Sequence, residues 1–401
     1  MLAVQMQRRL SRSDFSAMSF AVPLGTEVVN AFLALTQMAD VTYHRLITKR
    51  ENMRSSRRRV LIGMGSMVAA PFVAGPSFGQ DVEFKLRLHH FLARNGNVPA
   101  KFIAPWARKI ETESKGRIKI DLFPSMQLGG SPQQLFDQAR DGVVDIVWTL
   151  PAYTAGRFPM IEVFDLPFIG ARKAVPNSKA LQEFSERHLR DEFKEVHPIC
   201  FFAQDHGVIH ANKPIRTLDD LRGMRLRFSA RLLGDALRSV GVNAVSMPVP
   251  QVPEALAQRV IDGLVLAWEA VPTLKIHELV RFHTEIPGSP TLSTTSFLLA
   301  MNHKRYESLP GDLKAVIDAN SGMRPAAEAG AIWDNEAAAV TDLVRKRNNT
   351  IQSLPDESVK QWRKAVEPIY QGWVKQISER GQNGQKLLES ARELVAKYAS
   401  G

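Results

Sequence analysis

The side chains most able to do chemistry are arginines at the ends of predicted strands. Residues 223–229 alternate between apolar and polar types, which predicts a strand with Arg225 and Arg227 on one side. An arginine where a strand ends and a helix begins lies where open α/β sheets bind ligands. Its planar guanidinium can hold a carboxylate by two parallel hydrogen bonds. Arg157 follows another predicted strand and has the same potential. The alternative for each is a solvated arginine at a sheet edge.

Other reactive side chains do not form a catalytic pattern. The sequence has no zinc-protease helix motif, phosphate-binding glycine loop or nucleophile elbow. His206 and His210 are four residues apart, but their segment is predicted as strand or turn, and this spacing pairs metal ligands only on a helix. Cys200, the only cysteine, lies in an apolar run typical of a buried residue. We therefore expect no enzyme activity, no metal and no cofactor.

Strands and helices alternate along the chain after residue 81. Strands are predicted at 84–88, 118–123, 143–148, 223–229 and 260–266. Helices are predicted at 98–114, 131–140, 253–259 and over most of the chain from residue 310 onward. This alternation predicts an α/β fold with sheets covered on both faces. The segments around 143–148 and 260–266 are similar to each other, as two similar lobes would produce.

An export signal is predicted at residues 53–80. Three arginines, 57–59, precede an apolar run over 60–74, and small residues follow. The run contains Pro71 and falls short of the roughly 20 residues of a membrane span, which leaves a retained anchor as the alternative. It resembles a twin-arginine signal, although an ordinary secretory signal has similar features. We expect residues 1–52 to be an extension upstream of a true start at Met53, and cleavage to leave a periplasmic protein.

The charge of the remaining chain favours small anionic ligands. The whole sequence has 52 basic and 41 acidic residues, a net charge of +11. Residues 1–80 contain 10 of the basic and 4 of the acidic residues, so residues 81–401 carry +5. This modest excess suits attraction of a small anion and argues against nucleic acid as a partner. The remaining length is sufficient for two lobes, each with its own core.

Several motifs resemble the extracytoplasmic solute-binding proteins of tripartite ATP-independent periplasmic (TRAP) transporters, of the dicarboxylate-receptor type. The motifs are Gln127-Leu128-Gly129-Gly130, Leu166-Pro167-Phe168, the block from Lys213 to Arg227, and Met247-Pro248 leading to Ile261-Asp262-Gly263. The resemblance covers residues 82–395. It implies a bilobal, type II periplasmic-binding-protein fold with two mixed sheets flanked by helices, a hinge and a long bracing helix.

The resemblance also implies a division of the chain and a function. Lobe I would comprise 81–205 plus about 291–333, and lobe II 206–290 plus about 334–401 with the C-terminal helices. The protein would capture a small organic acid by lobe closure and deliver it to the membrane permease. The same fold can instead serve as a sensory subunit that presents its ligand to a receptor kinase. An exported lyase or hydrolase would need a base and nucleophile pair, which is not evident.

The resemblance assigns a carboxylate clamp to Arg227. The sequence departs from the family pattern at two positions. Leu266 stands in place of a ligand-binding asparagine, and Gly207 in place of an arginine of sialic acid receptors. Both departures favour a smaller and more apolar carboxylate as the ligand. The pattern around Trp268 and Glu269 resembles a branch that binds aromatic or short hydroxy and keto acids. The expected ligand-binding residues are Arg227, Arg157, Trp268, Glu269, Tyr153, His90, Trp148, Phe168 and Thr295.

Roles follow for three of these residues. Trp268 and Tyr153 come after equivalent strands of the two lobes, so we expect them to stack against the organic part of the ligand. Glu269 would repel a nearby ligand carboxylate unless it accepts a hydrogen bond from a ligand hydroxyl or pairs with a cation such as Arg157. We expect the hydrogen bond, and therefore tighter binding of a hydroxy acid than of its deoxy analogue.

Overall fold

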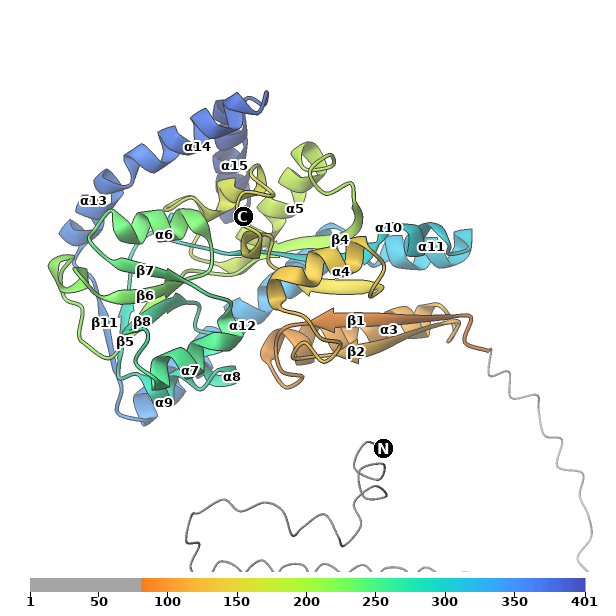
Figure 1. Ribbon diagram of the computed structural model, residues 1–401, viewed down its shortest axis with the longest axis horizontal. Coiled ribbons are helices and arrows are strands. Elements are labelled where there is room, and N and C mark those ends of the chain that lie inside the picture. Colours follow the sequence, from red (N-terminus) through yellow and green to blue (C-terminus); the bar gives the residue numbers. More distant parts are fainter. Residues whose placement is uncertain (1–80, 401) are drawn as a thin grey trace, which may run out of the picture. The chain divides into compact units, whose positions relative to one another are not determined.

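Two mixed β-sheets, each flanked by helices, form the framework of the protein (Figure 1). The computed structural model describes residues 81–400, so the predicted extension and export signal lie outside the described residues. The prediction of an α/β fold with two mixed sheets is confirmed.

The first sheet has the order β2-β1-β3-β10-β4. Its strands are β1 (Phe84–His90), β2 (Ile118–Phe123), β3 (Ile146–Thr149), β4 (Val196–Ala203) and β10 (Ser296–Asn302). Strands β2, β1 and β3 are parallel, whereas β10 runs antiparallel to both β3 and β4. Strand β10 therefore comes from a part of the chain almost one hundred residues beyond β4 and returns to the first sheet.

The second sheet has the order β11-β9-β5-β8-β6-β7. Its strands are β5 (Val208–Ala211), β6 (Arg225–Phe228), β7 (Asn243–Ser246), β8 (Gly263–Leu266), β9 (Phe282–Glu285) and β11 (Thr350–Ser353). Strands β8, β6 and β7 are parallel, so their carboxyl ends lie at one edge of this sheet. Arg227 is near the carboxyl end of β6, at the edge where open sheets bind ligands.

Helices cover both sheets. Their bounds are α3 Ala104–Glu113, α4 Leu135–Arg140, α5 Ala174–His188, α6 Arg231–Arg238, α7 Val252–Ala257, α8 Ala270–Thr273, α9 Ile276–Leu279, α10 His303–Glu307, α11 Gly311–Ala319, α12 Met323–Lys346, α13 Asp356–Ala365, α14 Glu367–Glu379 and α15 Gly384–Ala399. The predicted helix at 98–114 begins as a π-helical turn, Pro99–Ile103. The helix predicted from residue 131 begins at Pro132, where the Ser131 N–H donates to Gln134 Oε1 at 2.8 Å.

An internal similarity of the two sheets is visible in two matching contacts. Asp145 Oδ2 accepts a hydrogen bond from the Arg87 N–H of β1 at 2.8 Å. Asp262 Oδ2 accepts the corresponding bond from the Arg225 N–H of β6, also at 2.8 Å. Each aspartate precedes a buried strand, β3 or β8, and each pairs with the neighbouring parallel strand. Because of these turns, β3 and β8 each begin about three residues later in the chain than predicted.

Two connections and one long helix join the sheets. The chain passes between them over residues 204–207 and again over 286–295. Helix α12 packs against α5 and β4 and leads to β11 of the second sheet (Figure 1). The C-terminal helices are divided between the lobes, since α15 packs against α5, whereas the Trp362 indole of α13 donates to Ala236 O of α6. Residues 334–401 therefore do not all pack on lobe II, to which the sequence-based division assigned them.

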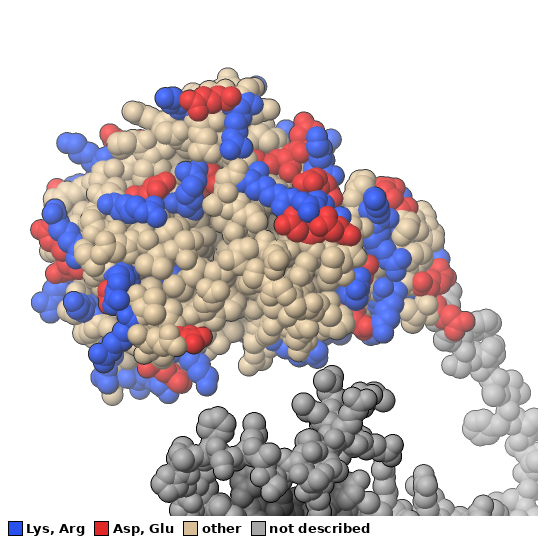
Figure 2. Space-filling model, viewed as in Figure 1, with Lys and Arg blue, Asp and Glu red and all other residues tan. Residues whose placement is uncertain are grey.

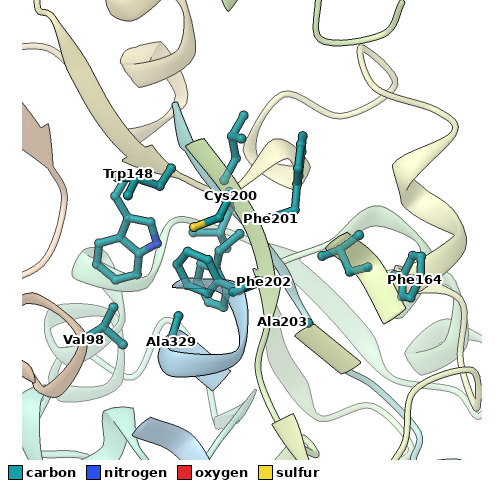
Figure 3. Packing of buried hydrophobic residues seen from close by; sticks show 14 of the residues in the cluster. Val98, Trp148, Phe164, Cys200, Phe201, Phe202, Ala203 and Ala329 are labelled. Carbon is teal, nitrogen blue, oxygen red and sulfur yellow. The ribbon is translucent and has the colours of Figure 1, made fainter. Parts of the chain in front are cut away.

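The core beneath the first sheet is apolar and rich in aromatic rings (Figure 3). Cys200 is fully buried in it beside Phe202, and burial raises the pKa of its thiol. This agrees with the expectation of a packing residue. On the outside, basic and acidic side chains are interspersed over the face shown in Figure 2. Across residues 81–400, no helix combines the length and the apolar character needed to cross a bilayer.

Candidate ligand-binding site

A cavity lies between the two sheets and contains about 480 Å³ of space, part of which is continuous with solvent. Residues of both lobes line it: Phe91, Leu92, Val98, Trp148, Leu150, Tyr153, Gln204, Arg227, Ser229, Val249, Val265, Leu266, Glu269, Ala270, Thr295, Phe297 and Trp333. The walls are therefore mainly apolar, with a few polar groups among them.

Aromatic rings of the first lobe form a continuous wall. Phe91 stacks on Trp148 with 4.6 Å between ring centroids, and its edge meets Tyr153 at 5.8 Å. Phe297 lies 5.7 Å from Trp148 and 5.3 Å from Trp333. These rings come from four separate segments of the chain, which β1, β3, β10 and α12 bring together. Such a wall suits a planar, apolar ligand body.

Arg227 supplies the cationic group of the cavity. Its side chain is 2% exposed, and its Nε donates to Met247 O at 2.9 Å. Its Nη2 has no hydrogen-bond partner among residues 81–400. Burial lowers the pKa of the guanidinium, an effect that the neighbouring Tyr153 partly offsets. A guanidinium remains charged in proteins, so a buried cation with a free donor faces this cavity.

Glu269 is a second buried ionisable group on the cavity wall. Its side chain is 3% exposed, and its Oε1 has no hydrogen-bond partner within the described part of the chain. Burial, together with the nearby carboxylates of Asp205 and Glu336, raises the pKa of Glu269 to about 8. The group is therefore mostly protonated and uncharged at pH 7. This differs from the charged carboxylate assumed in the sequence analysis.

Direct contacts across the cavity hold the lobes together. The Val249 N–H of the second lobe donates to the Tyr153 hydroxyl of the first at 3.1 Å. Arg231, the first residue of α6, forms an ion pair of 2.5 Å with Glu162 of the first lobe. Glu162 is almost fully buried in this contact. The structure thus represents a closed arrangement of the two lobes.

Five of the predicted site residues line the cavity: Arg227, Glu269, Tyr153, Trp148 and Thr295. Thr295 lies just before β10, and its Oγ1 is 3.3 Å from Ser229 Oγ of the other lobe.

The other four predicted residues, Arg157, Phe168, His90 and Trp268, are outside the cavity lining. Arg157 forms ion pairs with Asp137 at 2.6 Å and Glu195 at 3.1 Å, so its guanidinium already has anionic partners. Phe168 lies beneath the Arg363 guanidinium, 4.1 Å from ring centroid to Cζ.

His90 is buried behind Trp148, with 5.9 Å between the ring centroids. Burial lowers its pKa to about 4, so the imidazole is neutral at pH 7. It can therefore support the position of Trp148 but does not add a charge to the cavity.

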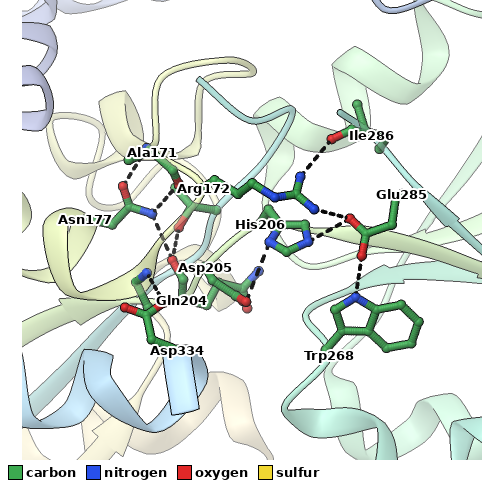
Figure 4. Close-up of polar contacts among 12 residues, drawn as sticks. Ala171, Arg172, Asn177, Gln204, Asp205, His206, Trp268, Glu285, Ile286 and Asp334 are labelled. Carbon is green, nitrogen blue, oxygen red and sulfur yellow. Dashed lines mark hydrogen bonds and ion pairs between the residues drawn. The ribbon is translucent and has the colours of Figure 1, made fainter. Parts of the chain in front are cut away.

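Trp268 belongs to a polar network at the junction of the lobes (Figure 4). Its Nε1 donates to Glu285 Oε1 at 2.5 Å, and the other carboxylate oxygen pairs with Arg172 at 2.6 Å and His206 at 2.8 Å. Burial alone would raise the pKa of Glu285, but the hydrogen bonds and charge of His206 and the further donors lower it to about 2. The network thus fixes the indole against the hinge.

Sequence reasoning missed Phe297, Trp333 and Phe91 as cavity residues. Phe297 lies in an apolar run and Trp333 on an amphipathic helix, so both have the pattern of ordinary core residues. Phe91 directly follows His90, and of these two residues only His90 was predicted at the site. Only the position of β10 beside β3 brings Phe297 to the cavity.

A family model described as "Bacterial extracellular solute-binding protein, family 7" matches residues 89–376. A TRAP solute-binding protein from Rhodoferax ferrireducens, solved with copurified benzoate, is 41% identical with a TM-score of 0.76, and the match covers 79% of this chain and 98% of that one. A marine metagenome TRAP solute-binding protein specific for aromatic acid ligands, solved with 3-hydroxybenzoate, is 42% identical with a TM-score of 0.77, covering 79% and 99%.

Among curated proteins, the "Outer membrane transporter protein TsaT" of Comamonas testosteroni is 28% identical, and the match covers 82% of this chain and 96% of that protein.

Proposed function

Because this chain belongs to family 7 of the bacterial extracellular solute-binding proteins, the receptors of TRAP transporters, we propose that its ligand is an aromatic monocarboxylate. The ligand is held in the cavity between the lobes and delivered to the membrane subunits of the transporter. The observation that carries this proposal is a buried arginine with a free donor beside a wall of aromatic rings.

Arg227 binds the ligand carboxylate. Its Nη2 needs a hydrogen-bond acceptor, and a carboxylate would satisfy both its charge and its free donor. No other lysine or arginine is among the described residues that line the cavity. One cation balances one carboxylate, which favours a monoanion over a dicarboxylate.

The rings of Phe91, Trp148 and Phe297 bind the apolar body of the ligand. Their mutual spacing of 4.6 to 5.7 Å leaves them in ordinary aromatic contact with one another, with one side available to the cavity. The benzoate and 3-hydroxybenzoate complexes of relatives at 41% and 42% identity agree with such a ligand. The transport role follows the family, which favours it over a sensory subunit for a kinase.

A ligand screen tests this proposal. The melting temperature of the purified protein is measured with benzoate, the three hydroxybenzoates and succinate. A ligand at one hundred times its Kd adds about 2.7 kcal/mol to the free energy of unfolding, which raises the melting temperature by several degrees. We expect the aromatic acids to cause this rise and succinate to cause little. A larger effect of succinate, or no effect of any aromatic acid, would contradict the proposal.

We further propose that residues 53–80 are removed on export, leaving a periplasmic protein that begins near Asp81. The support is the arginine-rich, apolar and small-residue pattern of that segment, together with the extracellular family. Intact-mass measurement of the native protein tests it, since a start between residues 77 and 82 is expected. A native chain that retains residues 53–80 would contradict it.

A further inference from the structure

We propose that Glu269 determines the specificity of the cavity by hydrogen bonding to a hydroxyl group on the aromatic acid. The ligand would then carry two polar groups, a carboxylate for Arg227 and a hydroxyl for Glu269. This inference rests on the proposed function, because it assigns a role to a residue of the same cavity. It goes further by naming the residue that separates hydroxylated acids from unsubstituted ones.

The position of Glu269 supports this role. Glu269 follows β8 and precedes α8, at the edge of the second sheet where β6 also places Arg227. In the first lobe, the Asn97 side-chain amide donates to the backbone carbonyl oxygen of Glu269 at 3.2 Å. This bond ties the backbone at Glu269 to the first lobe, while Oε1 of its side chain is left without a partner in residues 81–400.

Two unpartnered polar atoms thus belong to one apolar cavity, Arg227 Nη2 and Glu269 Oε1. The two side chains do not form an ion pair with each other in the described part of the chain. A buried polar atom without a hydrogen bond is costly, so each favours a ligand that supplies the missing partner. The Trp148 Nε1 is a third unpartnered atom and, as a donor only, it can add to the binding of the carboxylate.

The charge state of Glu269 is compatible with a nearby ligand anion. Burial, together with the nearby carboxylates of Asp205 and Glu336, raises its pKa to about 8. Lys101 is paired with Glu336 and so does not neutralise Glu269 directly. A protonated carboxyl can donate to or accept from a hydroxyl, and it does not repel a carboxylate bound at Arg227.

The experiment compares affinities for benzoate and the three hydroxybenzoates by calorimetry. We expect wild-type protein to bind at least one hydroxybenzoate about three- to tenfold more tightly than benzoate, the usual worth of one hydrogen bond. Glu269→Gln retains a neutral group that donates and accepts, so it should keep this ratio. Glu269→Met and Glu269→Leu remove the hydrogen bond, and the ratio should fall to within about twofold of one. Glu254→Met, the same substitution at an exposed glutamate of α7 that is not part of the cavity lining, is the matched control and should keep the ratio.

Equal wild-type affinity for benzoate and all three hydroxybenzoates would overturn this inference and leave the proposed function standing. A ratio that persists in both Glu269→Met and Glu269→Leu, or that is lost to the same extent in Glu254→Met, would also overturn it. Failure of the wild-type protein to bind any of the four acids would refute the proposed function and this inference with it. Melting curves verify that each variant is folded, and either apolar variant suffices for the comparison.

Discussion

Replacement of Arg227 by methionine should abolish ligand binding without destabilising the protein. The side chain is 2% exposed and its Nη2 lacks a partner, so in the absence of a ligand it is a buried cation with an incomplete set of hydrogen bonds. Methionine has a similar length and is uncharged, so it can fill the same space. The substitution should therefore separate binding from stability, which a purely structural arginine would not allow.

The size of each effect follows from the contacts of Arg227. Loss of one partner from a buried charge pair costs about 3–5 kcal/mol, so the affinity for benzoate should fall at least about a hundredfold. The lost bond from Nε to Met247 O, 2.9 Å long, leaves that carbonyl unpaired at a cost of about 1–3 kcal/mol. Removal of a buried charge gains a comparable free energy, about 1–4 kcal/mol. The two nearly cancel, and the free energy of unfolding should change little.

Calorimetry with benzoate and urea unfolding without ligand measure these two effects. Arg227→Lys is the matched control, because it retains the charge but not the planar fork, and we expect an intermediate loss of about tenfold. A loss of affinity below threefold in Arg227→Met would refute the assignment of the carboxylate to Arg227. Unfolding at much lower urea concentration with unchanged ligand affinity would indicate a structural role instead.

Three further predictions concern closure and pH. Tyr153→Phe removes the acceptor of the Val249 N–H across the cavity, so ligand affinity should fall about three- to tenfold by calorimetry; an unchanged affinity would contradict a role in closure. A double-mutant cycle of Arg231→Ala and Glu162→Ala should give a coupling energy of about 0.5–3 kcal/mol in ligand binding, whereas additive losses would show that their ion pair does not contribute. Because the raised pKa of Glu269 exceeds its ordinary value of 4.5, its contribution to stability is complete below about pH 4.5 and is lost as the pH rises through about 8. The melting temperature should therefore fall from pH 5 to pH 9 in the wild-type protein and fall less in Glu269→Gln; parallel curves would contradict the raised pKa.

Local sequence patterns predicted five of the eleven strands in residues 81–400, including β6, which carries Arg227 near its carboxyl end. The alternation over residues 223–229 predicted β6, and the cation was placed at the end of that strand. The similar turns before β3 and β8 predicted two related lobes, and the matching bonds of Asp145 and Asp262 agree with that interpretation. These features depend on neighbours within a few residues, so a single sequence carries them.

The remaining site residues depend on contacts between distant segments. Arg157 and Arg227 had equal standing in the sequence, but Asp137 and Glu195 neutralise only the first. Trp268 is adjacent to Glu269, yet its indole is bound by the hinge network, while the glutamate lines the cavity. Whether such a residue lines the cavity depends on ion pairs and hydrogen bonds to residues that are distant in the sequence. The periodicity of a local segment does not show these partners.

The two buried ionisable groups of the cavity explain why closure would require a ligand. If Glu269 were ionised and paired with Arg227, the closed lobes would satisfy their own charges and could close on an empty cavity. Instead Glu269 is neutral, and Arg227 has an unpartnered donor in the closed arrangement. In an open arrangement water can solvate Arg227, so closure without an anion removes this solvation and supplies no new partner for its Nη2. A ligand carboxylate restores the missing partner only in the closed state, and a ligand shifts a conformational equilibrium by its difference in affinity for the two states.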